Sequence, residues 1–540
     1  MEDLVSAAHA WDHLSLIGDL KRLSGSADER EAFARLRERL DGYGFTTTLT
    51  EHDAYISLPL AAGVQVIGPI TEGFYAITHS FSRSTPAGGI DLDLLDGKGA
   101  MPVDGSARGK AVLLDGLASP GGAVAARAAG AGAVIMVNPG PEIHEMIVSP
   151  VWGSPGAAEL GQLPDVTVVS VNRDAGAALR ARLAAGTVRV RILAASDTGW
   201  RRTPTLVAEI GSGDDFVLFS GHVDSWYYGV MDNGGANAVM VETGRVLAQH
   251  ASDLKRRLRL AFWSGHSHGR YSSSTWYVDH AFADLDAHCV AHVNVDSSGA
   301  KGSVVDLNPL VMAEARRVVA EVYAAQGYAG CDGRPMSRSH DQSFWGLGAT
   351  AVLGGVSTQA AGDDLTAGIT AARGQRRTGG TAWWWHSPDD TFDHMDADAL
   401  ARDARLYVGV VARLCTDQRL PFRFEDAAHE VRHVLHGLSE FGFDLRPSLA
   451  AADALGAALA GKQPDDATQK ALARLINPVL YTRAGRFGHD PALPVGLLPG
   501  LQPARALAGA DPDAARFLAV DLTREQNRVV HALAQALAIL

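Results

Sequence analysis

A regular alternation of apolar strands and helices in the middle of the chain constrains its fold more than any other feature. Residues 216–220 have the unbroken apolar character of a strand buried on both faces, and residues 236–250 form a helical pattern. Residues 258–263 and 289–295 are two further apolar strand patterns. This alternation is typical of a mostly parallel sheet with helices on both faces. We therefore predict an α/β fold of three layers.

The flanking regions differ in pattern from this α/β core. Residues 60–197 contain short β-like runs between Gly/Pro turns and Ala-rich helical stretches, without a cluster of acids and bases. We predict an inserted β-rich domain there, without catalytic residues. Helical periodicity returns over residues 421–540 and predicts a C-terminal helical domain. The α/β domain then comprises residues 1–59 and 198–420.

Two further segments carry local predictions. Residues 28–44 predict a helix, and residues 45–50 predict the strand that follows it. Residues 357–382 are rich in Gly, Ala and Thr, and predict a long loop that could close over a site as a lid.

Composition excludes several classes of function. The chain has a formal net charge of −13, whereas proteins that bind nucleic acids or anionic membranes present a dense positive charge. We therefore expect neither a nucleic acid nor a membrane as partner. No apolar run approaches the roughly 18 residues of a membrane span, and the acidic N-terminus does not resemble a secretory signal. The three cysteines are widely spaced and suggest neither a disulfide framework nor a Cys zinc site. We expect a cytoplasmic enzyme.

Candidate metal ligands follow the predicted strands. His222 and Asp224 form a His-x-Asp motif, Asp232 precedes an Asn-Gly-Gly turn, and Asp296 ends an apolar run. His386 follows three tryptophans and precedes two aspartates and a threonine, which are candidate partners for its ring. Ligands of open α/β sheets bind at the carboxyl ends of the strands, where these residues are expected. Each residue alone also fits a structural role, such as a helix cap, a turn or a packed histidine.

Taken in order, these motifs resemble the zinc aminopeptidase and glutamate carboxypeptidase superfamily, which also includes the transferrin receptor. The resemblance covers nearly the whole chain. Residues 23–26 look like the superfamily's N-terminal segment, residues 60–197 look like its protease-associated domain, and residues 421–540 are similar to the helical domain that some members use for dimerisation. The resemblance therefore implies a metallopeptidase-like α/β fold, zinc as cofactor and a homodimer.

The resemblance implies a two-metal site. His222 and Asp296 would bind one ion, Asp232 would bridge, and His386 would bind the second ion. The superfamily then carries two adjacent glutamates, of which the first is the general base and the second a metal ligand. This chain has His266 and Ser267 at those positions, within Gly-His-Ser-His-Gly.

The missing glutamates change the charge of the predicted site. Only Asp232 and Asp296 remain as anionic ligands, and unbalanced positive charge is costly in a low-dielectric cleft. We expect either one ion, or two with an added histidine ligand or a bound anion. Imidazole ligands favour a divalent transition metal, with zinc as the first choice and iron as the alternative. His266 is a general base, a metal ligand or a remnant of a dead site, and Asp224 and His268 complete the candidate catalytic set.

Aromatic residues and arginines near the predicted metal ligands suggest what kind of substrate would bind. Residues 226–228 and 383–385 are aromatic, which predicts an aromatic-lined pocket, although core packing explains them equally well. Arg270, Arg334 and Arg338 are candidates for holding a substrate carboxylate. Residues 339–344 resemble a Ser-Asp-His-x-Ser-Phe region of the superfamily with the middle pair exchanged.

Three functions remain open from the sequence. The first is a metal-dependent hydrolase of an amide-type bond in a small peptide or an acylated, possibly aromatic, amino compound. The second is a catalytically inactive homologue that keeps the fold for binding or assembly. The third is a single-metal lyase or an oxygen-using iron enzyme, because two histidines and one carboxylate can bind iron with open positions.

Overall fold

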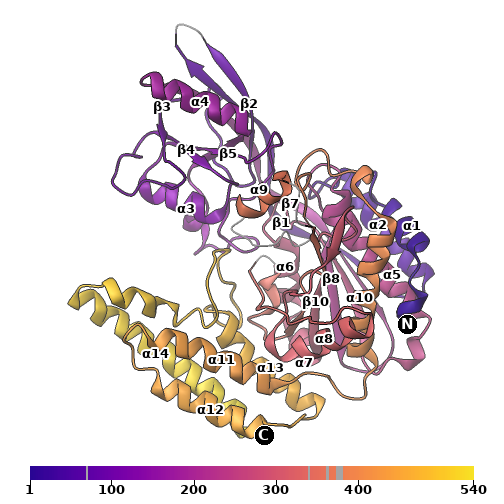
Figure 1. Ribbon diagram of the computed structural model, residues 1–540. Coiled ribbons are helices and arrows are strands. Elements are labelled where there is room, and N and C mark those ends of the chain that lie inside the picture. Colours follow the sequence, from indigo (N-terminus) through magenta and orange to yellow (C-terminus); the bar gives the residue numbers. More distant parts are fainter. Residues whose placement is uncertain (69–70, 339–340, 361–363, 373–380) are drawn as a thin grey trace.

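The computed structural model describes residues 1–68, 71–338, 341–360, 364–372 and 381–540. Figure 1 shows the α/β region at the centre, a strand-rich region above it and the C-terminal helices below it. No helix among the described residues has the length and apolar character needed to cross a bilayer.

The α/β region is built on six strands of one sheet, in the order β1, β7, β9, β8, β10, β12. Strands β9, β8, β10 and β12 run parallel, whereas β7 is antiparallel to both of its neighbours. The bounds are β1 Thr46–Ile67, β7 Arg189–Ile210, β8 Phe216–His222, β9 Arg257–Trp263, β10 Cys289–Asn294 and β12 Thr350–Val352. A separate antiparallel pair is formed by β11 Ser303–Val305 and β13 Ser357–Gln359. The predicted α/β fold with a mostly parallel sheet is confirmed.

Helices cover both faces of these strands. One face carries α1 Ala7–Ser15, α2 Ala27–Gly42, α5 Ala236–Ala248 and α10 Ala397–Thr416, with α8 Arg316–Ala325 packed beyond α10. The opposite face carries α6 Ser272–His280 and α7 Phe282–His288. Strand β8 illustrates the cause: Val217 and Phe219 pack toward the first face, while Phe216 and Leu218 pack toward the second. Successive side chains of a strand alternate between faces, so a strand buried on both faces must be apolar throughout.

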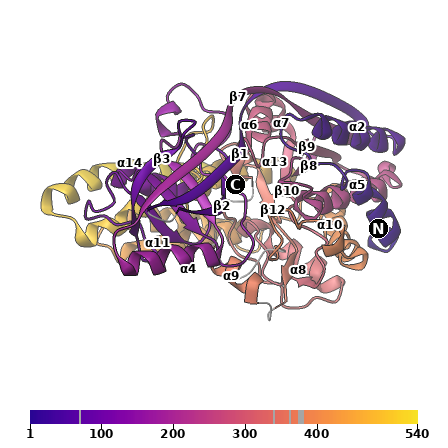
Figure 2. The same ribbon diagram turned by 90° about the horizontal axis from the view of Figure 1, so that it is seen from above.

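Strands β1 and β7 connect the α/β region to the strand-rich region. They pair along their whole length, with one irregularity between Pro59 and Ala61. Their outer halves continue the same sheet through β2 Glu72–Thr78, β6 Thr167–Val171, β5 Ala133–Val137, β4 Ala111–Asp115 and β3 Ile90–Asp96. Helices α3 Pro120–Ala129 and α4 Arg173–Ala185 complete this region. Figure 2 shows the β1–β7 ribbon crossing between the two regions, so the predicted boundaries at 59/60 and 197/198 fall inside continuous strands.

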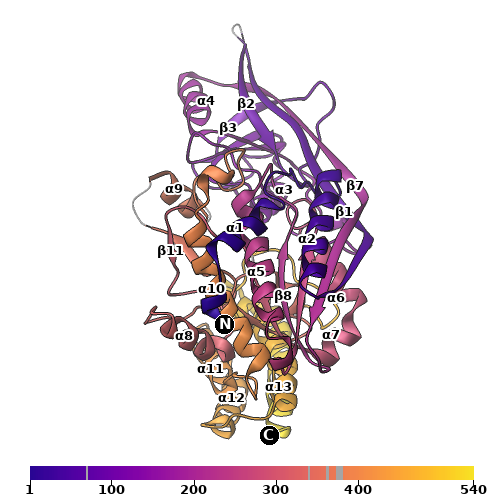
Figure 3. The ribbon, with the colours of Figure 1, turned by 90° about the vertical axis from the view of Figure 1, so that its right-hand side faces the viewer.

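Residues beyond 421 form α11 Phe424–Ser439, α12 Arg446–Leu459, α13 Asp466–Tyr481 and α14 Pro512–Ala538. Figure 3 shows them at the end of the molecule opposite β2. Their apolar side chains join the core that lies under α5 and α10. The expected loop 357–382 contains β13 and the helix α9 Asp364–Ala372, so that prediction was wrong for these residues. Residues 361–363 and 373–380 of the expected lid lie outside the described residues.

Candidate metal centre

Four predicted metal ligands meet at the carboxyl edge of the sheet. His222 ends β8, Asp232 lies in the turn Val230–Gly235 before α5, and Asp296 follows β10 by two residues. Asp232 stands between two histidines: its Oδ1 is 3.2 Å from His222 Nε2, and its Oδ2 is 3.0 Å from His386 Nε2. Asp296 Oδ1 lies 3.7 Å from His222 Nε2.

Backbone carbonyls fix the orientation of both histidine rings. His222 Nδ1 lies 2.7 Å from the carbonyl oxygen of Asp224, and His386 Nδ1 lies 2.6 Å from that of Glu145. A carbonyl only accepts a hydrogen bond, so in each neutral ring Nδ1 carries the proton and Nε2 carries the lone pair. The partner of His222 is therefore the carbonyl of Asp224, not the carboxylate that metal-bound histidines often use. Both Nε2 lone pairs then face the carboxylate of Asp232.

Either a proton on the imidazole or a cation bound between the imidazole and the carboxylate satisfies such a contact. His222 Nε2 and Asp232 Oδ1 are buried and lack a hydrogen-bond partner among the described residues. Burial alone would lower the pKa of His222, but the carboxylates of Asp232 and Asp296 raise it well above its usual value. A zinc ion bound tetrahedrally at about 2.0–2.2 Å separates its ligand atoms by roughly 3.4 Å. The two distances from His222 Nε2, 3.2 Å to Asp232 and 3.7 Å to Asp296, fit such an ion.

Two residues hold the loops that carry these ligands. The fully buried Arg22 donates hydrogen bonds to the carbonyls of Val223, Tyr228 and Gly229 in the loop after β8. Asp390 accepts hydrogen bonds from the main-chain N–H groups of Met231 and Asp232. Asp390 belongs to the aspartates that the sequence marked after His386. Arg22 was missed, because a lone arginine before the first long helix gives no sequence signal.

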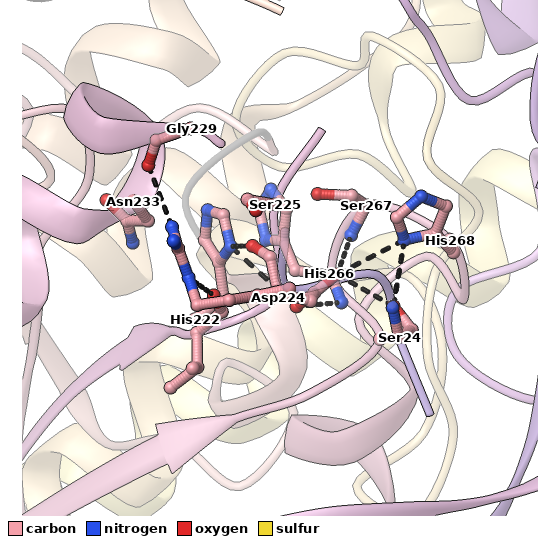
Figure 4. A network of polar contacts seen from close by, with 12 residues as sticks. Ser24, His222, Asp224, Ser225, Gly229, Asn233, His266, Ser267 and His268 are labelled. Atoms are coloured by element: carbon pink, nitrogen blue, oxygen red, sulfur yellow. Dashed lines mark hydrogen bonds and ion pairs between the residues drawn. The ribbon is translucent and has the colours of Figure 1, made fainter. Parts of the chain in front are cut away.

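The carboxylate of Asp224 holds the loop that carries His266 and His268. It accepts hydrogen bonds from the main-chain N–H groups of His266 and Ser267 at 3.1 and 2.8 Å, and from Ser24 Oγ at 2.9 Å. Figure 4 shows it at the centre of this network. Burial alone would raise the pKa of Asp224, but its hydrogen bonds and the surrounding histidines lower it below the usual value. Asp224 is therefore an ionised group that positions the loop of His266.

His266 lies beside the predicted metal ligands. Its ring stacks on that of His222 with centroids 3.8 Å apart and planes 6° apart, and Tyr271 contacts it edge-on at 4.2 Å. One ligand atom each from His222, His266 and Asp296 lie within 4.8 Å of one another. An imidazole binds a metal in its own plane, and two stacked parallel rings share no such point. In this arrangement His266 cannot share an ion with His222 unless its ring turns.

His268 occupies a different position. Its ring is fully buried, packs on Trp226 with centroids 4.3 Å apart, and places Nδ1 2.9 Å from Ser24 Oγ. It lines a neighbouring cavity that also contains Trp226, Tyr227 and Glu145. Of the three catalytic candidates, only His266 therefore lines the cavity of the metal ligands; Asp224 and His268 lie behind it.

The cavity at the metal ligands has a volume of about 180 Å³. Its walls include Asp232, Asp296, His266 and His386 and the aromatic residues Trp226, Tyr271 and Trp385. Of the three arginine candidates, Arg270 and Arg334 line it, whereas Arg338 pairs with Asp490 elsewhere at 2.6 Å. Asp341 is buried and accepts a hydrogen bond from Ser274. Residues 339–340 of the predicted 339–344 motif lie outside the described residues.

The strand-rich region contributes to the site through its backbone. Glu145 holds His386 with two main-chain contacts, because its carbonyl accepts from Nδ1 and its N–H donates to the His386 carbonyl at 3.0 Å. Met146 and Ile147 line the cavity. The prediction that residues 60–197 contain no catalytic residues did not anticipate this contact, since backbone contacts between distant segments leave no mark in sequence.

Glu145 is expected to make stability depend on pH. Its Oε2 is buried without a hydrogen-bond partner among the described residues, and burial raises its pKa to about 8. Above the ordinary pKa of 4.5 the unfolded chain loses this proton while the folded chain keeps it, so stability falls as pH rises from 4.5 to about 8. Glu145→Gln should therefore raise the free energy of unfolding by about 2 kcal/mol at pH 8.5 and by much less at pH 5. Urea unfolding at both pH values measures the difference, and an equal effect at both would contradict the assignment.

Comparisons with known proteins agree with the α/β fold. Residues 205–411 match peptidase family M28. "Probable glutamate carboxypeptidase VP8" of Zea mays is 30% identical over 86 residues, which span 15% of this chain and 12% of that protein. An aminopeptidase from Aneurinibacillus sp. strain AM-1 aligns with a TM-score of 0.56 and 18% identity, covering 77% of this chain and 95% of that one. BSAP, a zinc aminopeptidase from Bacillus subtilis, aligns with a TM-score of 0.57 and 18% identity over 77% of this chain and 97% of that one. For residues 205–411, the family match agrees with the superfamily that the order of the motifs predicted.

Proposed function

We propose that this chain, whose residues 205–411 form a peptidase family M28 domain, is a metal-dependent hydrolase of an amide-type bond in a small peptide or an acylated amino compound. The observation that carries the proposal is the pair of contacts at Asp232, where two histidine lone pairs face one carboxylate. Histidine nitrogens and carboxylate oxygens are ligands that zinc takes in proteins.

One ion is proposed, held by His222, Asp232 and Asp296. Two carboxylates and one neutral imidazole balance a single divalent charge. A second ion would have Asp232 and His386 as ligands, with Ser267 in place of the superfamily's second glutamate, and its charge would lack a further anion. The mixed nitrogen and oxygen donors favour zinc, with iron as the alternative.

The bound ion would polarise the amide carbonyl and lower the pKa of an attacking water. His266 would then accept the proton of that water and return it to the leaving amine. Burial, followed by the neighbouring His222, lowers the pKa of His266 to about 3, so its ring is neutral at neutral pH and has a free lone pair. Asp224 would position His266 by holding its main-chain N–H.

The two alternative functions, an inactive homologue and a lyase or oxygen-using enzyme, differ from the hydrolase in ways that can be tested. An inactive homologue has no need for the four ligands together. Their joint presence at one edge of the sheet, with Asp232, Asp296 and His386 in the wall of one cavity, supports an enzyme. A lyase or an oxygen-using enzyme would differ in the products formed and in a requirement for oxygen.

Assembly and location are further parts of the proposal. Helix α14 exposes Phe517 and Val520, with 76% and 50% of their surface accessible, which supports a homodimer formed through residues 421–540. We also propose that residues 60–197 are a protease-associated-like insert and that the protein is cytoplasmic.

Metal content tests the proposed function. Protein purified without added metal should contain close to one equivalent of zinc or iron by elemental analysis. Removal of the ion with a chelator should abolish hydrolysis of N-acylated amino acids and short peptides, and zinc should restore it. Magnesium serves as the control ion, because nitrogen ligands disfavour it. Protein that holds no transition metal would exclude both enzymatic functions.

A further inference from the structure

Arg270 lies in the wall of the metal cavity, four residues after His266. Its backbone is held in a left-handed conformation with φ of 47°, followed by Tyr271 with φ of 65°. Gly153 donates a hydrogen bond to the Arg270 carbonyl at 2.6 Å, and Arg270 Nε donates to the Ser149 carbonyl at 3.2 Å. Trp152 stacks on Tyr271 with centroids 4.0 Å apart. Contacts from a distant segment therefore hold Arg270 in place, and unusual backbone conformations of this kind cluster at functional sites.

The charge of Arg270 has no counterpart within the described residues. No carboxylate there forms an ion pair with it, and its one hydrogen-bond acceptor is a carbonyl. The other two arginines named from the sequence are paired: Arg334 lies 3.9 Å from Asp306, and Arg338 lies 2.6 Å from Asp490. Burial lowers the pKa of Arg270 to about 10, so the guanidinium stays charged at neutral pH.

A half-buried, unpaired guanidinium is costly for the free protein and useful for a ligand. Its planar fork matches the two oxygens of a carboxylate, and such charge-assisted pairs are among the strongest polar contacts in proteins. The cavity of about 180 Å³ also contains Asp232, Asp296 and His266, so a ligand of amino-acid size can contact Arg270 and reach the metal ligands.

We propose that Arg270 binds a carboxylate of the substrate, which makes the preferred substrates N-acylated amino acids with a free carboxylate, cleaved at the neighbouring amide. This inference rests on the proposed hydrolase function. Aromatic walls formed by Trp226, Tyr271 and Trp385 suit an aromatic side chain or acyl group on the same molecule. Arg334 already lies close to Asp306 and is assigned no such role.

Two probes that differ only in charge test the proposal on the zinc-loaded protein: N-acetylphenylalanine and N-acetylphenylalaninamide. The acid should bind about 100-fold more tightly than the amide by calorimetry, and should be hydrolysed to acetate and phenylalanine with a higher kcat/KM. Arg270→Met should remove this preference, because binding of the acid weakens about 100-fold while binding of the amide changes less than about 3-fold. Arg270→Lys should keep part of the preference, because it keeps the charge without the fork.

Arg334→Met is the matched control, since it removes an arginine from the same cavity and should leave the preference for the acid intact. An acid that binds no more tightly than the amide, or a preference that survives Arg270→Met, would overturn the proposal. Arg270-dependent binding without hydrolysis would instead refute the hydrolase function and leave the carboxylate site standing. Equal hydrolysis of both probes would refute the carboxylate site and leave the hydrolase function standing.

Discussion

Asp232→Ala is expected to empty the metal centre and to lower kcat/KM by at least about 10,000-fold. The carboxylate of Asp232 contacts the Nε2 atoms of two predicted ligands, at 3.2 Å for His222 and 3.0 Å for His386. Without it, the two histidines keep their orientation through the carbonyls of Asp224 and Glu145 but share no anion. Elemental analysis of the purified variant, together with turnover measured at saturating zinc, checks both parts.

Asp306→Asn provides the control for this variant. Asp306 is a buried carboxylate in the wall of the same cavity, near Arg334 and outside the predicted ligand set. The control should retain its metal and most of its activity, with unchanged far-UV circular dichroism. If Asp232→Ala still binds one equivalent of zinc and turns over normally, the centre is not where we place it.

The α/β fold was predictable because its signal is local and repeated. Strand β8 is apolar at every position from Phe216 to Phe219, and the structure buries all four side chains completely. Helices α2 and α5 and strands β8, β9 and β10 lie within one or two residues of the patterns that indicated them. The continuity of β1 and β7 as two long paired strands could not be predicted. Each strand passes from one packing environment to another, so its pattern changes midway and resembles two shorter elements.

The predicted metal ligands could be identified from the sequence, but the residues that hold them in position could not. Parallel strands end at one edge of a sheet, so residues that follow β8 and β10 must lie near each other. Sequence order therefore sufficed to bring His222, Asp232 and Asp296 together. The contact of the Glu145 carbonyl, the burial of Arg22 and the lack of an ionic partner for Arg270 among the described residues all depend on how segments far apart in sequence pack together. A residue's missing partner, in particular, is visible only when all its neighbours are in place.

His266→Ala decides among the three roles that the sequence left open for His266. A general base contributes about 100- to 10,000-fold to a hydrolysis rate, so kcat should fall by about 1,000-fold. The metal should stay bound, because the ring of His266 stacks on that of His222 and does not share its plane. Elemental analysis and kcat are both required. Loss of the ion together with activity would assign His266 as a ligand, and unchanged kcat with the ion retained would leave it without a catalytic role.

His268→Ala is the matched control, because it removes the second histidine of the same Gly-His-Ser-His-Gly stretch. His268 is fully buried against Trp226, contacts Ser24 and is not among the residues that line the metal cavity. Its loss should affect stability more than kcat. His266→Glu adds a further distinction, since it restores the superfamily's residue at that position while Ser267 stays in place. Recovery of turnover in that variant would show that the position needs a proton acceptor and that one ion suffices without the second glutamate. Failure despite retained metal would show that the rest of the site is adapted to a neutral base.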